Sequence, residues 1–169
     1  MRPIPFQLAY LLLGTNLGDR SAILRRSCQK IEARCGHIQA HSQIWRTASW
    51  GIEDQPDFLN LCIAVRTGMT AAPLLRELLA IELEIGRVRR IKWASRLIDI
   101  DILLFGQEVI DRPQIKVPHP FMTERNFALG PLSDIAGEMV HPVHHKTIRQ
   151  LYRECTDPLE AEPVTAEIL

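Results

Sequence analysis

Two aspartates one residue apart are the side chains best placed to do chemistry. Asp99 and Asp101 alternate with Ile98, Ile100 and Ile102 in a run typical of a β-strand. Successive side chains of a strand point to opposite faces, so both carboxylates are expected on one face and the isoleucines on the other. Carboxylates aligned in this way can bind one cation or a close pair, and oxygen ligands suit Mg²⁺. A half-exposed strand with a polar outer face is the alternative.

A cluster of positive charge directly precedes this strand. Residues 87–96 carry five cationic side chains and no acidic one, although the whole chain has 20 Lys+Arg, 20 Asp+Glu and a net charge of +0. A polyphosphate with bound Mg²⁺ needs cations beside paired carboxylates, because its charge must be neutralised from both sides. A solvated basic loop is the alternative. The sequence has no P-loop and no G-x-G-x-x-G motif, so side chains and Mg²⁺ would hold a nucleotide.

A third set of residues could hold a flat heterocycle. Phe58 and Asn60 alternate onto one face of a predicted strand, placing an aromatic ring beside an amide that both donates and accepts hydrogen bonds. Phe127, which follows Arg125, could stack on the opposite side. The alternative places Phe58 in the core and Asn60 at a turn. His119, between two prolines, is suited to donate a hydrogen bond to phosphate.

Hydrophobic periodicity predicts the elements that position these residues. They are a strand at 6–13, a helix between 19 and 36, strands at 38–46 and 58–65, a helix at 73–85 and a strand at 98–105. This order is that of the ferredoxin-like βαββαβ sandwich, an α+β fold with a mainly antiparallel sheet and helices on one face. The other face would be left to loops and a site.

The rest of the chain is expected to add little regular structure. A short hairpin at 107–110 and helical stretches at 121–132 and 147–153 follow the last strand. A single domain is expected over residues 1–169, with a loose C-terminal tail at 157–169.

Composition limits the classes of protein to consider. Hydrophobic residues make up 46% and charged residues 24%, which is typical of a folded globular domain. The balanced charge argues against binding to a nucleic-acid backbone. The longest early apolar stretch, at 8–13, is far shorter than the roughly 20 residues of a membrane span, so no membrane partner is expected. Four cysteines without CxxC spacing are expected as reduced thiols, in a cytoplasmic protein.

These motifs together resemble the 6-hydroxymethyl-7,8-dihydropterin pyrophosphokinase family. The matching stretches, in the order of the family, are AYLLLGTNLGDR at 9–20, DQPDFLN at 54–60, GRVR at 86–89, RLIDIDILLFG at 96–106, VPH at 117–119 and residues 124–132. The usual family pattern differs at Ala48, where proline is common, and at Ala94-Ser95, where Gly-Pro is common.

The resemblance implies transfer of the pyrophosphoryl group of ATP to the hydroxymethyl oxygen of 6-hydroxymethyl-7,8-dihydropterin, releasing AMP, in folate biosynthesis. Asp99 and Asp101 would hold two Mg²⁺ ions. Arg87 and Arg96 would stabilise the transferring phosphates, and Asp99 would help to orient the attacking hydroxyl. The implied ATP-binding residues are Glu82, Arg87, Arg89, Lys92, Trp93, Arg96, Ile102, His119 and Arg125. The implied pterin-binding residues are Thr47, Ala48, Trp50, Phe58, Asn60 and Phe127.

Two other functions remain as alternatives to this enzyme, which is expected to be a monomer. A non-catalytic nucleotide or RNA binder on the same fold would use exposed sheet aromatics, but aromatic residues make up only 6% of the chain. A pterin aldolase would need acid–base groups but neither ATP nor the aspartate pair. Formation of AMP from ATP would distinguish the three.

Overall fold

The computed structural model describes residues 5–48, 56–86 and 97–165. The elements are β1 (Gln7–Thr15), α1 (Arg20–Arg34), β2 (His37–His41), β3 (Ile44–Thr47), β4 (Phe58–Thr67), α2 (Ala71–Ile85), β5 (Asp99–Phe105), β6 (Ile110–Arg112), β7 (Ile115–Val117), the 3-10 helix η1 (Met122–Glu124), α3 (Asn126–Ala136), α4 (Ile148–Glu154) and β8 (Ala161–Val164). None of the helices in these described ranges combines the length and apolar character needed to cross a bilayer.

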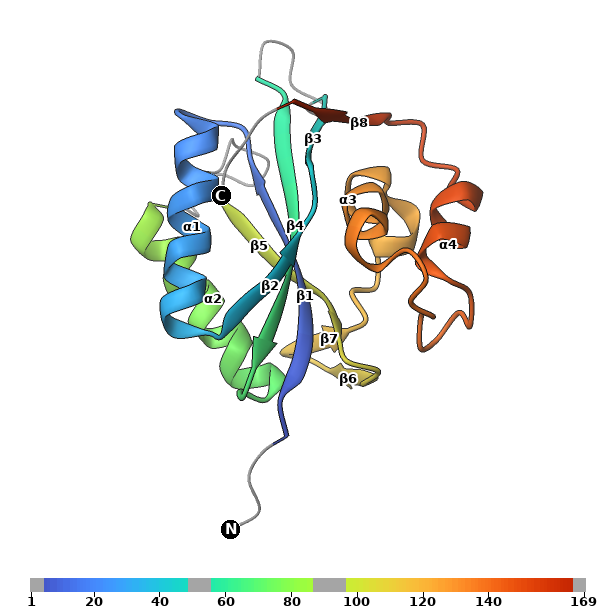
Figure 1. Cartoon of the computed structure of the whole chain (residues 1–169), viewed down its shortest axis with the longest axis horizontal. Helices are drawn as coiled ribbons and strands as arrows, with labels where there is room; N and C mark the ends of the chain where they lie inside the picture. The colour runs from blue at the N-terminus through green and yellow to red at the C-terminus, as the bar shows by residue number, and fades with distance from the viewer. Residues whose placement is uncertain (1–4, 49–55, 87–96, 166–169) are drawn as a thin grey trace.

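One antiparallel sheet organises the molecule (Figure 1). Its strand order is β5-β1-β4-β3-β8, and β2 also pairs with β4. The predicted ferredoxin-like sandwich is confirmed by this order and by the helices between the strands. The strand predicted at 38–46 is instead two strands, β2 and β3. Ser42 separates them: its hydroxyl, rather than its carbonyl, accepts the Cys62 amide at 2.9 Å, which interrupts the ladder.

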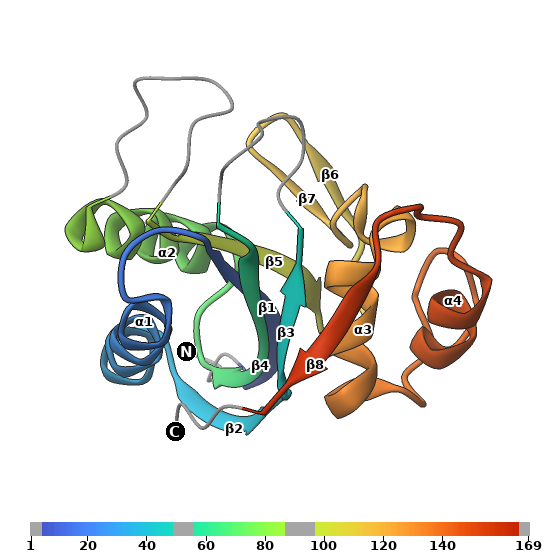
Figure 2. The same ribbon diagram turned by 90° about the horizontal axis from the view of Figure 1, so that it is seen from above.

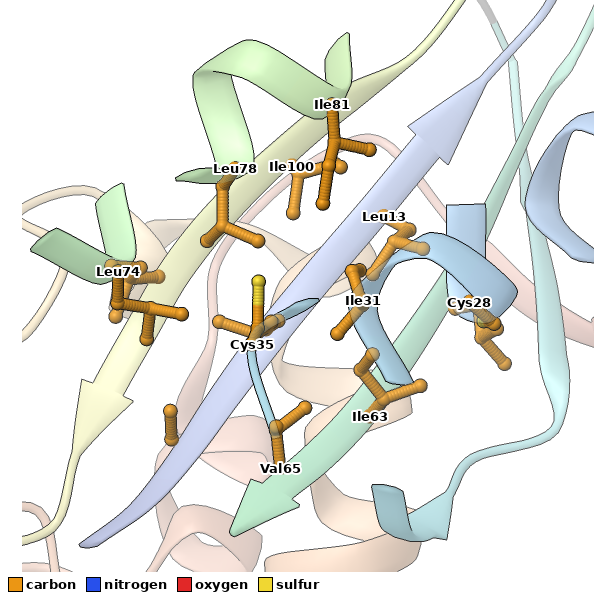
Figure 3. Close-up of a cluster of buried hydrophobic side chains, with 14 of the residues drawn as sticks. Leu13, Cys28, Ile31, Cys35, Ile63, Val65, Leu74, Leu78, Ile81 and Ile100 are labelled. Atoms are coloured by element: carbon orange, nitrogen blue, oxygen red, sulfur yellow. The ribbon is translucent and has the colours of Figure 1, made fainter. Parts of the chain in front are cut away.

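Helices α1 and α2 cover one face of the sheet and form the first hydrophobic core with it (Figures 1 and 3). Helix α1 begins after Asp19 and α2 ends at Ile85, as predicted, but α2 begins at Ala71, before the predicted position 73, and α1 ends at Arg34. Asp19 caps α1 by accepting the Ala22 amide at 3.0 Å, and Gly86 ends α2 in the left-handed region at a φ of 109°. Leu13 of β1 and Ile100 of β5 point into this core.

The second face is partly covered as well, which the sequence did not predict. Helix α3 packs on β4 and β3, and α4 packs on α3, so a second core lies between them and the sheet (Figure 2). The approach is close at Gly130, where a Cβ would lie 2.6 Å from the ring of Trp45. Trp45 also donates to the Asp134 carboxylate at 2.9 Å, which fixes α3 on β3. Only the remaining part of this face is left for a site.

Strand β5 contains a bulge that shifts its alternation between the two cores. Tyr10 of β1 pairs with Leu104, and the next residue, Leu11, pairs with Ile102. Leu103 therefore has no pairing partner on β1. Before the bulge the isoleucines face the first core. After it, Leu103 and Leu104 both contribute to the second core.

Two expectations for the C-terminal third are wrong. Residues 107–110 do not pair back on β5; instead β6 and β7 form a separate two-stranded sheet. The segment from 157, expected as a loose tail, contains β8, which pairs with β3 from Thr47↔Ala161 to Ile44↔Val164. The physical reason is that β3 would otherwise present an unpaired edge, which β8 covers.

Candidate active site

The two aspartates lie together on the second face of the sheet. Both are half-buried, and both line the same cavity of about 670 Å³. Cross-strand pairing places Asp99 beside Gly14 and Asp101 beside Leu12 of β1. The alternation predicted for this stretch is therefore present, with the intervening Ile100 buried in the core below.

The same cavity collects most of the predicted site residues that the structure describes. Side chains from β3, β4, β5 and the region around η1 and α3 converge on it. They are Thr47, Ala48, Phe58, Asn60, Asp99, Asp101, His119, Arg125 and Phe127.

Asn60 is the buried polar group at one end of the cavity. Only 3% of its surface is exposed, and its amide nitrogen donates to the Thr47 hydroxyl at 2.8 Å. Because that bond fixes the amide, the carbonyl oxygen is directed to the side of Gly14, whose added Cβ would lie 3.1 Å from it. Phe58 precedes it on β4, half-buried in the cavity wall. The arrangement presents an acceptor beside an aromatic ring, as predicted.

The turn after β1 and the first residue of α1 hold the entry to β4 at this end of the cavity. The Arg20 guanidinium donates to the carbonyl of Asp57 at 2.7 Å, directly before Phe58. Asn16 donates more weakly, to the carbonyl of Pro56 at 3.5 Å. These bonds fix the entry to β4, so the turn acts on the site through Phe58.

Arg125 and Phe127 form the opposite wall. The Arg125 guanidinium lies 5.3 Å from the Phe121 ring centroid and 5.5 Å from that of Phe127, within the range of cation–π attraction. Phe127 lies in the first turn of α3, the helix that packs on β4 and β3.

His119 is held by the bulge of β5. Its backbone amide donates to the Leu103 carbonyl at 2.9 Å, and its Nδ1 accepts the Phe121 amide at 3.2 Å. Burial, and next the charge of Arg125, lower the pKa of His119 below its usual value. The lowered pKa favours the neutral ring, and because Nδ1 accepts, Nε2 carries the hydrogen and can donate a hydrogen bond to an anion.

A second cavity of about 270 Å³ adjoins the first, since Asp101 and His119 line both. Ile102 lines this second cavity, together with Leu75 and Lys116. Two predicted ATP-site residues, Ile102 and His119, thus meet at the β5 edge of the sheet.

Glu82 is placed differently from the other predicted residues. It is buried on α2 and lines neither cavity in the described part of the chain. Its carboxylate accepts the Ile100 amide at 2.7 Å, between the two aspartates in sequence. Ile100 belongs to β5, the last strand on its side of the sheet, so Glu82 satisfies a donor on that edge.

Several predicted residues lie outside the described ranges, and their positions are not part of this geometry: Trp50, Arg87, Arg89, Lys92, Trp93 and Arg96.

Other cavity residues had not been predicted. Phe121 and Glu124 follow the predicted His119 closely in sequence, and that proximity was the signal available for them. Asp157 and Leu159 also line the cavity, although they belong to the segment expected to be loose. No local pattern marks these two, because they reach the cavity only through folding.

The donor set of the cavity fits Mg²⁺. In the described residues, no group of three or more His, Cys, Asp or Glu side chains is arranged to hold a metal. Mg²⁺ does not require one, because it usually takes one or two carboxylates and completes its shell with water and substrate phosphates. Asp99 and Asp101 supply two carboxylates in a cavity with room for a polyphosphate.

Comparison with known proteins places the chain. Residues 10–137 match the family described as 7,8-dihydro-6-hydroxymethylpterin-pyrophosphokinase (HPPK). A 2-amino-4-hydroxy-6-hydroxymethyldihydropteridine pyrophosphokinase from Aquifex aeolicus is 38% identical over 147 residues, covering 87% of this chain and 91% of the relative. The protein of that name from Bacillus subtilis is 39% identical over 133 residues, covering 78% and 80%.

Solved structures agree on the fold. The crystal structure of Plasmodium falciparum HPPK-DHPS A437G with SDX-DHP superposes with a TM-score of 0.74 at 20% identity. The match covers 89% of this chain and 45% of that one, so this chain spans less than half of that protein. The two pyrophosphokinases from Aquifex aeolicus and Bacillus subtilis are matched over most of their own length, and together with the family match they show that this chain belongs to the 7,8-dihydro-6-hydroxymethylpterin-pyrophosphokinase family.

Proposed function

We propose that the cavity on the second face of the sheet is where this chain transfers the pyrophosphoryl group of ATP to the hydroxymethyl group of 6-hydroxymethyl-7,8-dihydropterin. Membership of the family supplies the reaction. The chain is a pyrophosphokinase of folate biosynthesis that uses ATP as its co-substrate. What the geometry adds is an assignment of roles to individual residues.

The observation that carries the assignment is the position of Gly14. It pairs with Asn60 on one side and with Asp99 on the other. Two inter-strand spacings, about 10 Å, therefore separate the amide from the carboxylate across a residue without a side chain. A pterin bound at Asn60 can extend its hydroxymethyl group over Gly14 toward Asp99. The acceptor and the metal-binding carboxylates are thus within one substrate's length of each other.

The pterin is held by stacking and by edge recognition. Phe58 and Phe127 supply aromatic faces from opposite walls, and the Asn60 carbonyl oxygen accepts a hydrogen bond from the edge of the ring. Thr47 fixes the orientation of that amide. A site that fixes a buried acceptor in this way discriminates strongly against rings lacking the matching donor.

The triphosphate is held from the other side. Asp99 and Asp101 would hold two Mg²⁺ ions, which when bound neutralise the phosphate charge and polarise the transferring group. His119 donates from Nε2 and Arg125 contributes a positive charge, while Arg87 and Arg96 complete the cationic side. The hydroxymethyl oxygen attacks the β-phosphorus, the bond from that phosphorus to the oxygen bridging to the α-phosphate breaks, and AMP leaves with that oxygen. The hydroxyl proton passes to solvent, with Asp99 orienting the hydroxyl. Positioning, rather than covalent chemistry, is what the protein supplies.

Incubation with ATP, Mg²⁺ and 6-hydroxymethyl-7,8-dihydropterin tests the proposal. AMP and the pterin diphosphate are expected in equal amounts; ADP would indicate ordinary phosphoryl transfer and would contradict it. Asp99→Asn and Asp101→Asn preserve shape but weaken cation binding, so turnover should fall at least about a hundredfold in each. Glu138→Gln is the matched control, because Glu138 is an exposed carboxylate paired with Arg149 at 2.8 Å. Full activity in both aspartate variants would refute the metal assignment.

The remaining expectations are also part of the proposal. Residues 1–169 act as one pyrophosphokinase domain, a monomer, in the cytoplasm. The described cysteines support a reducing compartment, since all are free and three are buried. Sedimentation at micromolar concentration tests the monomer.

A further inference from the structure

The segment 157–159 contacts both the cavity and the start of α3. The Asp157 carboxylate accepts the backbone amide of Asn126 at 3.0 Å and that of Leu159 at 2.9 Å. In return, the Asn126 side chain donates to the carbonyls of Asp157 at 3.2 Å and Leu159 at 3.1 Å. Three hydrogen bonds thus join the C-terminal segment to the first residue of α3, and the fourth closes the segment on itself.

Helix α3 depends on this segment for its N-terminal cap. The residue at its cap position, Arg125, makes no side-chain capping bond. The first amides of a helix need an acceptor, and a carboxylate there also interacts favourably with the helix dipole. Asp157, 31 residues away in sequence, supplies both the acceptor and the negative charge. The capped residue, Asn126, directly precedes Phe127.

The two aromatic walls of the cavity are therefore held in different ways. Phe58 is the first residue of β4 and pairs with Thr47 of β3, so its position follows from the sheet. Phe127 lies in the first turn of a helix, where the backbone is ordered only as well as the cap that holds it. Leu159 lies in the same cavity wall and is anchored by the same carboxylate.

We propose that Asp157 is a positioning residue for the pterin: by capping α3 it sets the distance between Phe127 and Phe58. The inference rests on the proposed function and deepens it. The family match ends at residue 137, so Asp157 lies outside the part of the chain that the match covers. The Arg125 amide donates to the Met122 carbonyl of η1 at 3.4 Å, so the ATP side has an attachment outside α3 and depends less on this cap.

A matched carboxylate on the same helix separates positioning from stability. Asp134 also accepts two hydrogen bonds, from the Gln43 amide at 3.1 Å and the Trp45 indole at 2.9 Å, and it too joins α3 to another segment. It does not line the cavity in the described residues. Asp157→Ala and Asp134→Ala should therefore lower the melting temperature similarly and differ in substrate binding.

Steady-state kinetics of AMP release with the full chain provide the test. In Asp157→Ala the KM for the pterin is expected to rise about fivefold, which corresponds to loss of one helix cap, with kcat at saturating pterin and the KM for ATP within twofold of the unchanged protein. Asp134→Ala should leave the pterin KM unchanged. Asp157→Asn, which keeps one acceptor oxygen, should fall between Asp157→Ala and the unchanged protein, and it replaces the alanine variant if that variant does not fold.

The outcomes distinguish the inference from the proposal beneath it. No AMP from the unchanged protein would overturn the proposed function. An active protein whose pterin KM is unaffected by Asp157→Ala would overturn the positioning role alone. A pterin KM raised equally by Asp134→Ala would also overturn it, because general loosening of α3 would then explain the effect.

Discussion

Replacement of Gly14 by alanine should affect binding of the two substrates differently. A Cβ at this position would lie 3.1 Å from the Asn60 carbonyl oxygen. Within the described residues, and apart from the adjacent chain, no other heavy atom would lie within 4 Å of it. Asp99 pairs with Gly14 from the opposite side and is not displaced. Gly14→Ala is therefore expected to weaken binding of the pterin and to leave binding of ATP unchanged.

The size of the effect follows from that contact. A separation of 3.1 Å is a few tenths of an ångström shorter than ordinary van der Waals contact, so the Asn60 amide must shift. It is buried and bonded to Thr47, so the shift misaligns the hydrogen bond that we propose Asn60 makes to the pterin. Loss of one such hydrogen bond costs about 1 kcal/mol, or about fivefold in Kd. Stability should not fall, since alanine restricts the unfolded chain more than glycine does.

Isothermal titration with the pterin, and separately with a non-hydrolysable ATP analogue and Mg²⁺, measures both affinities. Gly68→Ala is the control, because its Cβ would meet only Phe6 at an ordinary 3.6 Å among the described residues. Unchanged pterin affinity in Gly14→Ala would refute the assignment of Asn60. Equal losses for both ligands would show that the two substrates do not occupy opposite sides of Gly14.

Three further predictions follow from the same structure. Arg20→Ala removes the bond to the Asp57 carbonyl, so the pterin KM should rise severalfold in steady-state assays while the ATP KM does not; equal changes would contradict a role through the pterin wall. Burial, and next the charges of His144 and His145, lower the pKa of His141 from 6.5 to about 4. Between these pH values the unfolded chain binds a proton that the folded chain excludes, so the free energy of unfolding falls as pH falls from 6.5 to 4. His141→Asn keeps an acceptor that does not titrate, so the variant should lose less stability over this pH range in thermal melts. An unchanged pH profile would contradict the role of His141. Titration with Mg²⁺ alone should show millimolar or weaker binding, strengthened at least about tenfold by an ATP analogue; tight binding without nucleotide would contradict a substrate-completed metal site.

The sequence predicted the fold where side-chain pattern alone decides it. Alternation in β5 assigned Asp99 and Ile100 to opposite faces because only one face of that stretch lies against a core. The same reasoning could not locate the bulge, since Leu103 is apolar and both faces of β5 are buried at that point. The break between β2 and β3 could not be predicted either, because it depends on the Ser42 hydroxyl replacing a backbone carbonyl as acceptor.

The site was predictable where its residues come from short motifs. Phe58 and Asn60 share a strand face, and that relation is local. The contribution of Asp157 is not local: its partner Asn126 is 31 residues away, and an Asp-Pro-Leu stretch carries no periodicity. Glu82 is a third case. The family resemblance implies that it binds ATP, but tertiary packing directs its carboxylate to the backbone amide of Ile100 in β5.

The unmatched residue in β5 has a consequence for how this protein tolerates changes in chain length. Deleting Leu103 would leave Leu104 and Phe105 facing the layers they face now, because removal of a bulge restores simple alternation. The remaining side chains would keep their layers, but the second core would lose the buried Leu103, and the carbonyl that receives the His119 amide would be gone. Shortening by one position would thus preserve the alternation of β5, remove one buried side chain and detach the segment of His119 from its anchor.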